Sequence, residues 1–181
     1  MVILGWTLGH LFSSYGIEVD PEKFKAVIEM SPPRTLKQIK SFLVRLGYMR
    51  RFITDFALKA KPLTNMLKKD VPFLWIEGVK GDFDDLKYVM TSGPVLMPPS
   101  FEKPFFLYIS ATDFSLGGML SQLDNDTKDR EIYFISRTLI RYELNYTPIE
   151  KLCLSLIFTT KKLRHYLLNN QINVLTQSDL V

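Results

Sequence analysis

The feature that most constrains the fold is a change in the spacing of apolar residues near the middle of the chain. As far as Gly93-Pro94 these residues recur at the three- and four-residue spacing of helices, whereas after residue 104 they fall in short strand-like runs. Prolines and a serine between these parts, at 98–100 and 103–104, indicate a linker. We therefore expect a mainly helical half followed by a mixed half, an α/β (α+β) chain.

The first half has recognisable element boundaries. Residues 7–19 predict two short β segments around a turn at Tyr15-Gly16. Asp20 followed by Pro21 predicts a helix start, because Asp is a favoured N-cap and Pro fits the first helical position. Further helices are expected at 35–53, 62–67 and 79–90.

The second half predicts three strands, a long amphipathic helix and one more strand. Their expected ranges are 105–109, 116–122, 131–136, 146–168 and 172–176. The order βββαβ belongs to an α/β domain with a mixed sheet. Gly117-Gly118 lies inside the second strand, where glycine marks close backbone packing. Cys153 lies beside the apolar stripe of the long helix, so we expect a buried thiol.

Composition limits the classes of function. A formal net charge of +4 is mildly basic and by itself a weak indication of a polyanionic partner. One cysteine cannot form an internal disulfide or a cysteine-based metal cluster, and His10 and His165 are too far apart in sequence for a zinc motif. With no run of eighteen apolar residues, no membrane partner is expected. The composition fits the reducing interior of a cell, cytoplasm or nucleus.

Three groups of sequence strings then occur in a fixed order. They are LGH at 8–10 with GIEVDPEK at 16–23; SFLVRLGYMRRFITDFALKAKPLT at 41–64; and SATDFSLGGML at 110–120 with SRTL at 136–139, NYTPIEK at 145–151 and LRHYL at 163–167. In this order and spacing they resemble gypsy-type (LTR) retrotransposon polyproteins, over the reverse-transcriptase thumb and the RNase H-like domain. The match covers nearly the whole chain, which resembles a degenerate genomic copy.

The resemblance implies a division into four parts. Residues 1–20 resemble the end of the palm with its primer-grip hairpin, and residues 21–72 resemble the helical thumb. Residues 73–103 would form a connecting helix and linker. Residues 104–181 resemble an RNase H-like domain, a mixed β-sheet with a long helix, that is incomplete at its C-terminal end.

The resemblance also implies non-specific binding of an RNA–DNA hybrid or a template–primer duplex. Gly9 and His10 belong to the hairpin that holds the primer-end phosphate in this family. Basic residues off the apolar stripe of the thumb helix would neutralise phosphates without reading sequence. The expected contacts there are Lys40, Arg45, Tyr48, Arg50 and Arg51, with a core position for Tyr48 equally open. The upstream polymerase half of the polyprotein is a further expected partner.

One residue of the thumb departs from the family pattern. Val44 stands where members usually carry glycine, which lets the duplex approach closely. We expect the fold to tolerate Val44 and the grip on nucleic acid to weaken.

The chemistry of the family requires carboxylates that hold magnesium. The polymerase Tyr-x-Asp-Asp string does not occur in this sequence. The RNase H carboxylate positions fall, by the resemblance, on Ser110, Leu152 and Gln177. None of these side chains is an acid, so we expect no catalytic residue, no metal site and no cofactor.

Two alternatives remain open. Asp113, Glu150 and Asp179 lie near the three positions, and an active Mg²⁺-dependent RNase H would have to use them. Glu150 is two residues from Leu152, about 200° around a helix, so it should point away from the others. The second alternative is a non-functional relic or an interaction module without a nucleic-acid role.

Overall fold

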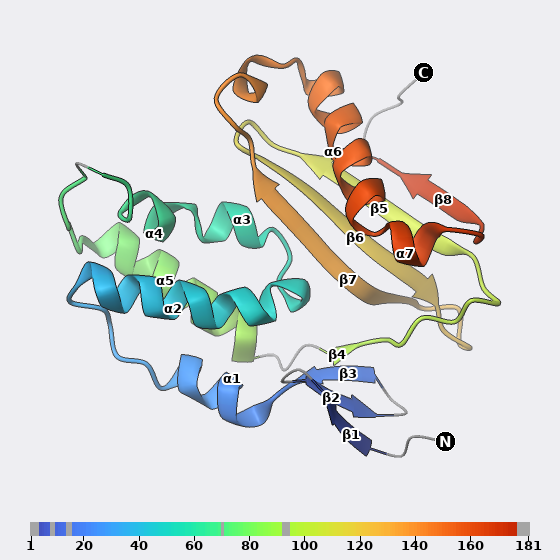
Figure 1. Cartoon of the computed structure of the whole chain (residues 1–181), viewed down its shortest axis with the longest axis horizontal. Coiled ribbons are helices and arrows are strands. Elements are labelled where there is room, and N and C mark those ends of the chain that lie inside the picture. The colour runs from blue at the N-terminus through green and yellow to red at the C-terminus, as the bar shows by residue number, and fades with distance from the viewer. Residues whose placement is uncertain (1–3, 8–9, 14–15, 70, 92–94, 177–181) are drawn as a thin grey trace. The chain divides into compact units, whose positions relative to one another are not determined.

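The computed structural model describes residues 4–7, 10–13, 16–69, 71–91 and 95–176 (Figure 1). Contacts divide the chain into two units: Met1–Ile53 with Lys59–Val95, and Thr54–Leu58 with Leu96–Val181. No helix in the described ranges is both long and apolar enough to cross a membrane.

The first unit begins with an antiparallel meander of β1 (Leu4–Thr7), β2 (His10–Ser13) and β3 (Gly16–Val19). The pairing of Ser13 with Gly16 agrees with the predicted hairpin, although the turn itself lies outside the described residues. Strand β1 was not predicted. The two-residue β4 (Val95–Leu96) is the fourth strand of this sheet.

Helices α1 (Pro21–Ile28) and α2 (Leu36–Met49) start where their caps predict. The Asp20 side chain accepts a hydrogen bond from Glu22 N at 2.9 Å, and Thr35 Oγ1 accepts one from Gln38 N at 3.3 Å. These bonds satisfy N–H groups that a helix leaves without internal partners. The predicted helix 35–53 is α2 followed by a 3₁₀ turn, η1 (Arg50–Phe52).

The core of the first unit lies between α2 and α5 (Glu77–Thr91). Its fully buried side chains include Ile39, Phe42, Leu46, Phe83 and Leu86. The rings of Phe42 and Phe83 are 4.5 Å apart, a distance at which aromatic pairs attract each other beyond simple burial. Two short helices follow η1: α3 (Phe56–Lys59), most of which belongs to the second unit, and α4 (Lys61–Asn65), near the predicted 62–67.

The second unit contains the predicted mixed sheet. Strands β5 (Phe105–Ala111), β6 (Ser115–Leu123) and β7 (Asp129–Thr138) are antiparallel neighbours, and β8 (Ile172–Leu175) pairs with β5 in parallel. The strand order is β7-β6-β5-β8. The βββαβ prediction is therefore confirmed.

Helix α6 (Pro148–Lys162) crosses one face of this sheet and is followed by a single turn, α7 (Arg164–Leu167) (Figure 1). The predicted helix 146–168 is thus two helices with Leu163 between them. Leu163 and Leu167 pack against Phe105 and Leu107 of β5. Because both leucines pack on the sheet, the point where the helix is interrupted is part of the core.

Close packing at the predicted glycines is confirmed. A Cβ added to Gly118 would collide with Thr159 Cγ2 of α6, and Ser155 Oγ donates to Gly117 O at 2.8 Å. The prediction for Cys153 was wrong, because its thiol is exposed. Leu152 and Ser155 face the sheet instead, and Cys153 falls on the opposite side of the helix.

Candidate functional site

The solvent-facing side of α2 carries two of the predicted nucleic-acid contacts of the thumb, Lys40 and Tyr48. Lys37, Lys40, Val44 and Tyr48 are spaced three and four residues apart, so they share one face of the helix. Both lysines are exposed, and Val44 and Tyr48 retain 56% and 61% of their accessible surface. Tyr48 is therefore a surface residue, which decides between its two predicted placements.

The three arginines occupy different environments. Arg45 Nη1 donates a hydrogen bond to Ala26 O at 3.1 Å and so ties α2 to the end of α1. Arg50 in η1 is exposed, and Arg51 is half-buried. Their roles as phosphate contacts stay predictions.

His10, the predicted primer-grip residue, is buried. Its side chain is 9% exposed, and its ring centroid lies 5.6 Å from that of Phe52. Burial lowers the pKa of the imidazole, and the positive charges of Arg51 and Lys23 lower that pKa further. The ring is therefore neutral near pH 7, and its Nδ1 has no hydrogen-bond partner in the described structure. Gly9 lies outside the described residues.

Ser110 lies near the end of β5 beside a cavity of about 370 Å³ that the first turn of α6 helps to line. Leu152 contributes a hydrocarbon side chain, Lys151 an ammonium group and Asp113 a carboxylate, whereas the Ser110 hydroxyl points to the opposite face of the sheet. Two of the three family positions, Ser110 and Leu152, thus line one cavity, although the Ser110 hydroxyl points away from α6. The third, Gln177, lies outside the described residues.

The acids near these positions have other partners. Asp113 Oδ1 is 3.9 Å from Nζ of Lys151, whose side chain is 9% exposed. The Glu150 carboxylate accepts hydrogen bonds from Thr147 N at 2.7 Å and Thr147 Oγ1 at 2.9 Å, completing a capping box. These bonds lower the pKa of Glu150 and hold its carboxylate at the start of the helix. Asp179 lies outside the described residues.

The donors around this cavity do not fit Mg²⁺, the ion that the family's chemistry requires. Magnesium prefers carboxylate and other hard oxygen ligands, whereas Leu152 offers none and Lys151 adds positive charge. In the part of the chain that the structure describes, no three His, Cys, Asp or Glu side chains are grouped as metal ligands.

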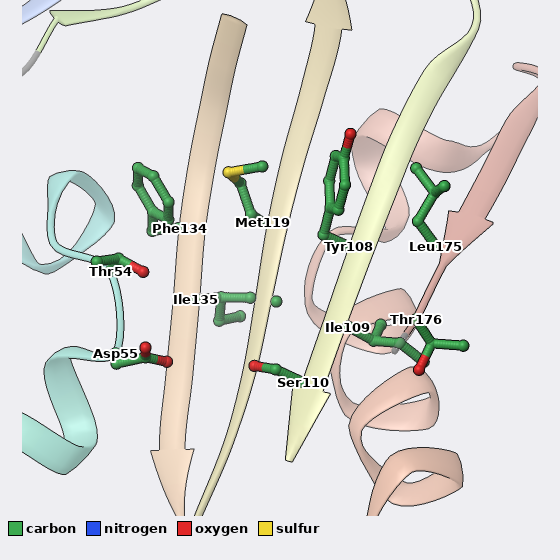
Figure 2. Close-up of a pocket in the computed structure, with 11 residues that line it drawn as sticks. Thr54, Asp55, Tyr108, Ile109, Ser110, Met119, Phe134, Ile135, Leu175 and Thr176 are labelled. Carbon is green, nitrogen blue, oxygen red and sulfur yellow. The ribbon is translucent and has the colours of Figure 1, made fainter. Parts of the chain in front are cut away.

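A second cavity, of about 480 Å³, lies in the same unit. Leu107 and Ile109 belong to the core, so the alternating residues Tyr108 and Ser110 point to the other face of the sheet. Figure 2 shows Tyr108, Met119 and Phe134 on neighbouring strands, where the register pairs each with the next. They form an apolar row beside Ser110.

Asp55 adds a carboxylate to this second cavity, and no sequence pattern predicted it. A Cβ added to Gly117 would lie 2.7 Å from Ser110 Oγ and 3.1 Å from Asp55 Oδ1. Asp55 has a φ of 50°, a conformation that Asp and Asn adopt more readily than most residues. A single carboxylate beside a hydroxyl does not provide the ligands of a two-metal site.

Fold and sequence together define the class of protein. A model of the family described as the RNase H-like domain found in reverse transcriptase matches residues 75–174. The chain belongs to this family.

The relatives come from retrotransposons. The chain is 40% identical to the retrovirus-related Pol polyprotein from transposon opus of Drosophila melanogaster, over 88% of this chain and 17% of that protein. It is 35% identical to the Pol polyprotein from transposon gypsy of the same fly, over 93% and 17%. A Tf2-3 transposon polyprotein of Schizosaccharomyces pombe is 31% identical, over 88% and 12%. The chain thus spans less than a fifth of the length of these relatives.

Solved structures share the fold. A foamy viral protease–reverse transcriptase in complex with an RNA/DNA hybrid matches 97% of this chain and 24% of its own, with a TM-score of 0.80 and 20% identity. The same viral protein in complex with double-stranded DNA also matches with a TM-score of 0.80. The predicted family and fold class are both confirmed, as an RNase H-like domain of a retrotransposon polyprotein.

Proposed function

We propose that this chain is a duplex-binding segment of a retrotransposon polyprotein that holds an RNA–DNA hybrid or template–primer duplex without reading its sequence and without cutting it. The exposed basic face of α2 carries the proposal. Lys37 and Lys40 are exposed there beside Tyr48, and no acid in the described structure lies within ion-pair distance of either lysine.

Two exposed lysines on one helix face, with no acid partner in the described structure, suit a polyanion whose phosphates recur along a helix. Each phosphate that a lysine or arginine neutralises releases condensed counterions, so binding gains free energy without any base contact. Foamy viral reverse transcriptases of the same fold have been captured on an RNA/DNA hybrid and on double-stranded DNA. This supports the choice of a duplex as the partner.

The chemistry of the cavity at Ser110 supports binding without cleavage. A hydrocarbon side chain, an ammonium group and the single carboxylate of Asp113 line it, whereas cleavage by two metal ions needs several carboxylates. Asp113 lies 3.9 Å from the Lys151 ammonium, and the Glu150 carboxylate is hydrogen-bonded to Thr147. An active site built on Asp113, Glu150 and Asp179 would lack the second of these acids, because the capping box holds Glu150 at the start of α6.

The relatives are several times longer than this chain, so we also propose that the polymerase half of such a polyprotein acts with it. In that arrangement the active carboxylates for DNA synthesis come from the polymerase half.

The test combines binding and cleavage on one labelled RNA–DNA hybrid, with Mg²⁺ or Mn²⁺ present. We expect a gel shift and intact RNA. Lys40→Gln should weaken binding about two- to fivefold at low salt. The matched control is Lys80→Gln on α5, whose lysine already pairs with Glu77 at 3.2 Å, and it should change affinity less than twofold.

Each of the other outcomes would support one of the two alternative hypotheses. Metal-dependent cutting that is lost in Asp113→Asn would establish an active RNase H. Absence of both shift and cutting would favour a relic or an interaction module.

A further inference from the structure

A short segment after η1 forms one wall of the second cavity. The residues Thr54–Leu58 closely follow this 3₁₀ turn, yet their contacts assign them to the second unit. Ala57 N donates a hydrogen bond to Ser136 Oγ of β7 at 2.9 Å, which fixes the segment on the sheet. The cavity beside it has a volume of about 480 Å³, within the roughly 300–1,000 Å³ of small-molecule sites.

Gly117 of β6 leaves room for a ligand against the sheet. A Cβ at this position would lie 2.7 Å from Ser110 Oγ and 3.1 Å from Asp55 Oδ1, so both oxygens lie beside the same glycine. Figure 2 shows Ser110 on β5 and Asp55 on the segment 54–58, each with an oxygen directed toward the space between them. Glycine inside a strand often marks a place where a ligand approaches the backbone closely.

The two oxygen-bearing side chains are available to a ligand. Within the described ranges neither the Asp55 carboxylate nor the Ser110 hydroxyl has a hydrogen-bond or ion-pair partner, and both residues are exposed. Leu58 N donates to Asp55 O at 2.9 Å, so the turn holds the backbone of Asp55 and leaves its carboxylate available. Asp129 differs, because its Oδ2 accepts a hydrogen bond from the Tyr108 hydroxyl at 2.6 Å.

The apolar row of this cavity offers a surface for a flat hydrocarbon group. Tyr108, Met119 and Phe134 are half-buried neighbours on β5, β6 and β7. The hydrogen bond to Asp129 holds the ring of Tyr108 in place, and the polarisable thioether of Met119 packs favourably against aromatic rings. Apolar walls with a few convergent polar groups are the usual composition of a small-ligand site.

We infer that this cavity binds a small organic cation, an aromatic ring that carries an alkylammonium group. The ring packs on Tyr108, Met119 and Phe134, and the ammonium donates hydrogen bonds to the Asp55 carboxylate and to Ser110 Oγ. An ammonium has three donors and no acceptor, which suits two oxygens that can both accept. The site goes beyond the proposed duplex binding, because the Asp55 carboxylate attracts a cation and repels a phosphate.

The test is a titration of the unaltered chain with tryptamine, whose alkylammonium is protonated near pH 7 as that of lysine is. Methionine methyl groups labelled with ¹³C report binding by NMR, and Met119→Leu identifies the signal of Met119. We expect a saturable shift of that signal. Asp55→Asn should weaken binding about five- to thirtyfold, because a hydrogen bond to a charged group is replaced by a neutral one. Asparagine also adopts a positive φ readily, so the variant should fold.

Two controls isolate the charge pair. Asp126→Asn removes the same charge from an exposed acid in the turn before β7, which does not line the cavity, and it should change affinity less than twofold. Indole-3-ethanol carries a hydroxyl in place of the ammonium of tryptamine. It should bind the unaltered chain at least about fivefold more weakly than tryptamine does, and Asp55→Asn should not weaken its binding.

Three results would overturn the inference. The first is the absence of a saturable shift with up to about 10 mM tryptamine, a range that includes the weak affinity expected of so small a ligand. The second is equal affinity for tryptamine and indole-3-ethanol. The third is an Asp55→Asn variant that binds tryptamine as tightly as Asp126→Asn does, while its other methionine methyl signals show that it is folded.

Discussion

Gly118 shows how a single residue controls the packing of α6 on the sheet. A Cβ added there would collide with Thr159 Cγ2, and the helix backbone cannot yield without moving its buried side chains. We expect Gly118→Ala to lower the free energy of unfolding by about 1–3 kcal/mol. Urea unfolding measures the loss.

A substitution at Thr159, the residue that the added Cβ would meet, provides the control. Thr159→Ser removes the colliding methyl group and keeps the hydroxyl that donates to Ser155 O at 2.8 Å. In the Thr159→Ser background, Gly118→Ala should therefore cost less than in the unaltered chain. Equal costs in both backgrounds would show that the contact with Thr159 is not the cause.

The ion pair of Arg137 with Glu143 should make the free energy of unfolding depend on pH. Arg137 donates to both Glu143 carboxylate oxygens, at 2.6 and 2.8 Å, and Glu143 is 5% exposed. These bonds lower the pKa of Glu143 below its ordinary value. The unfolded chain therefore binds the proton more tightly, so the stabilisation is complete above the unfolded pKa and is lost as pH falls through the lower, folded pKa.

Glu143→Gln should consequently reduce the free energy of unfolding by about 1.5–3 kcal/mol at pH 7. The difference between the two proteins should shrink at acid pH, below about pH 4. Unfolding curves at several pH values measure it. A difference independent of pH would contradict the assigned role of the carboxylate charge.

Residue positions were predictable where local geometry decides them. The helical period correctly separated Glu150 from Leu152, and two adjacent glycines within a strand correctly indicated close packing. Cys153 was misplaced because apolar neighbours on both sides do not show which side of the helix faces the sheet. Asp55 was missed because its surroundings come from segments distant in sequence.

At the scale of one element, the exposed face of α2 determines how closely a bound duplex can approach the helix backbone. Val44 is 56% exposed on the same face as Lys40 and Tyr48. A β-branched side chain there holds a flat partner away from the helix backbone. We expect Val44→Ala to raise hybrid affinity and Val44→Gly to raise it further, as fluorescence anisotropy can measure.

The two substitutions at Val44 should change the free energy of unfolding only slightly and in opposite directions. Alanine is the better helix former, so Val44→Ala should stabilise α2 by roughly 0.5 kcal/mol, whereas Val44→Gly should destabilise it by a similar amount. Affinity that follows helix stability rather than side-chain size would refute the steric explanation.

Most elements could be located because their caps and apolar periods are local signals. Asp20, Thr35 and Thr147 all accept the capping hydrogen bonds that define helix starts. The end of α6 could not be placed, because Leu163 and Leu167 continue an apolar pattern while the chain turns to pack on β5. Strand β1 was missed because only its pairing with β2 identifies it.

For the molecule as a whole, the sequence predicted a helical part followed by a mixed sheet, and the family comparison agrees with the resemblance. What the sequence could not provide is the arrangement of charge on surfaces formed by several elements. The approach of Asp55 to Ser110 and the cavities on either side of Ser110 depend on packing between elements.

The most direct test of the central claim is the affinity of the chain for two RNA–DNA hybrids of unrelated sequence, measured between about 50 and 200 mM salt. If binding depends on neutralising phosphates, the logarithm of the association constant should fall linearly with log salt. The slope should be the same, and the affinity nearly the same, for both hybrids. Absence of binding at the lowest salt, or a marked preference for one sequence, would contradict the account.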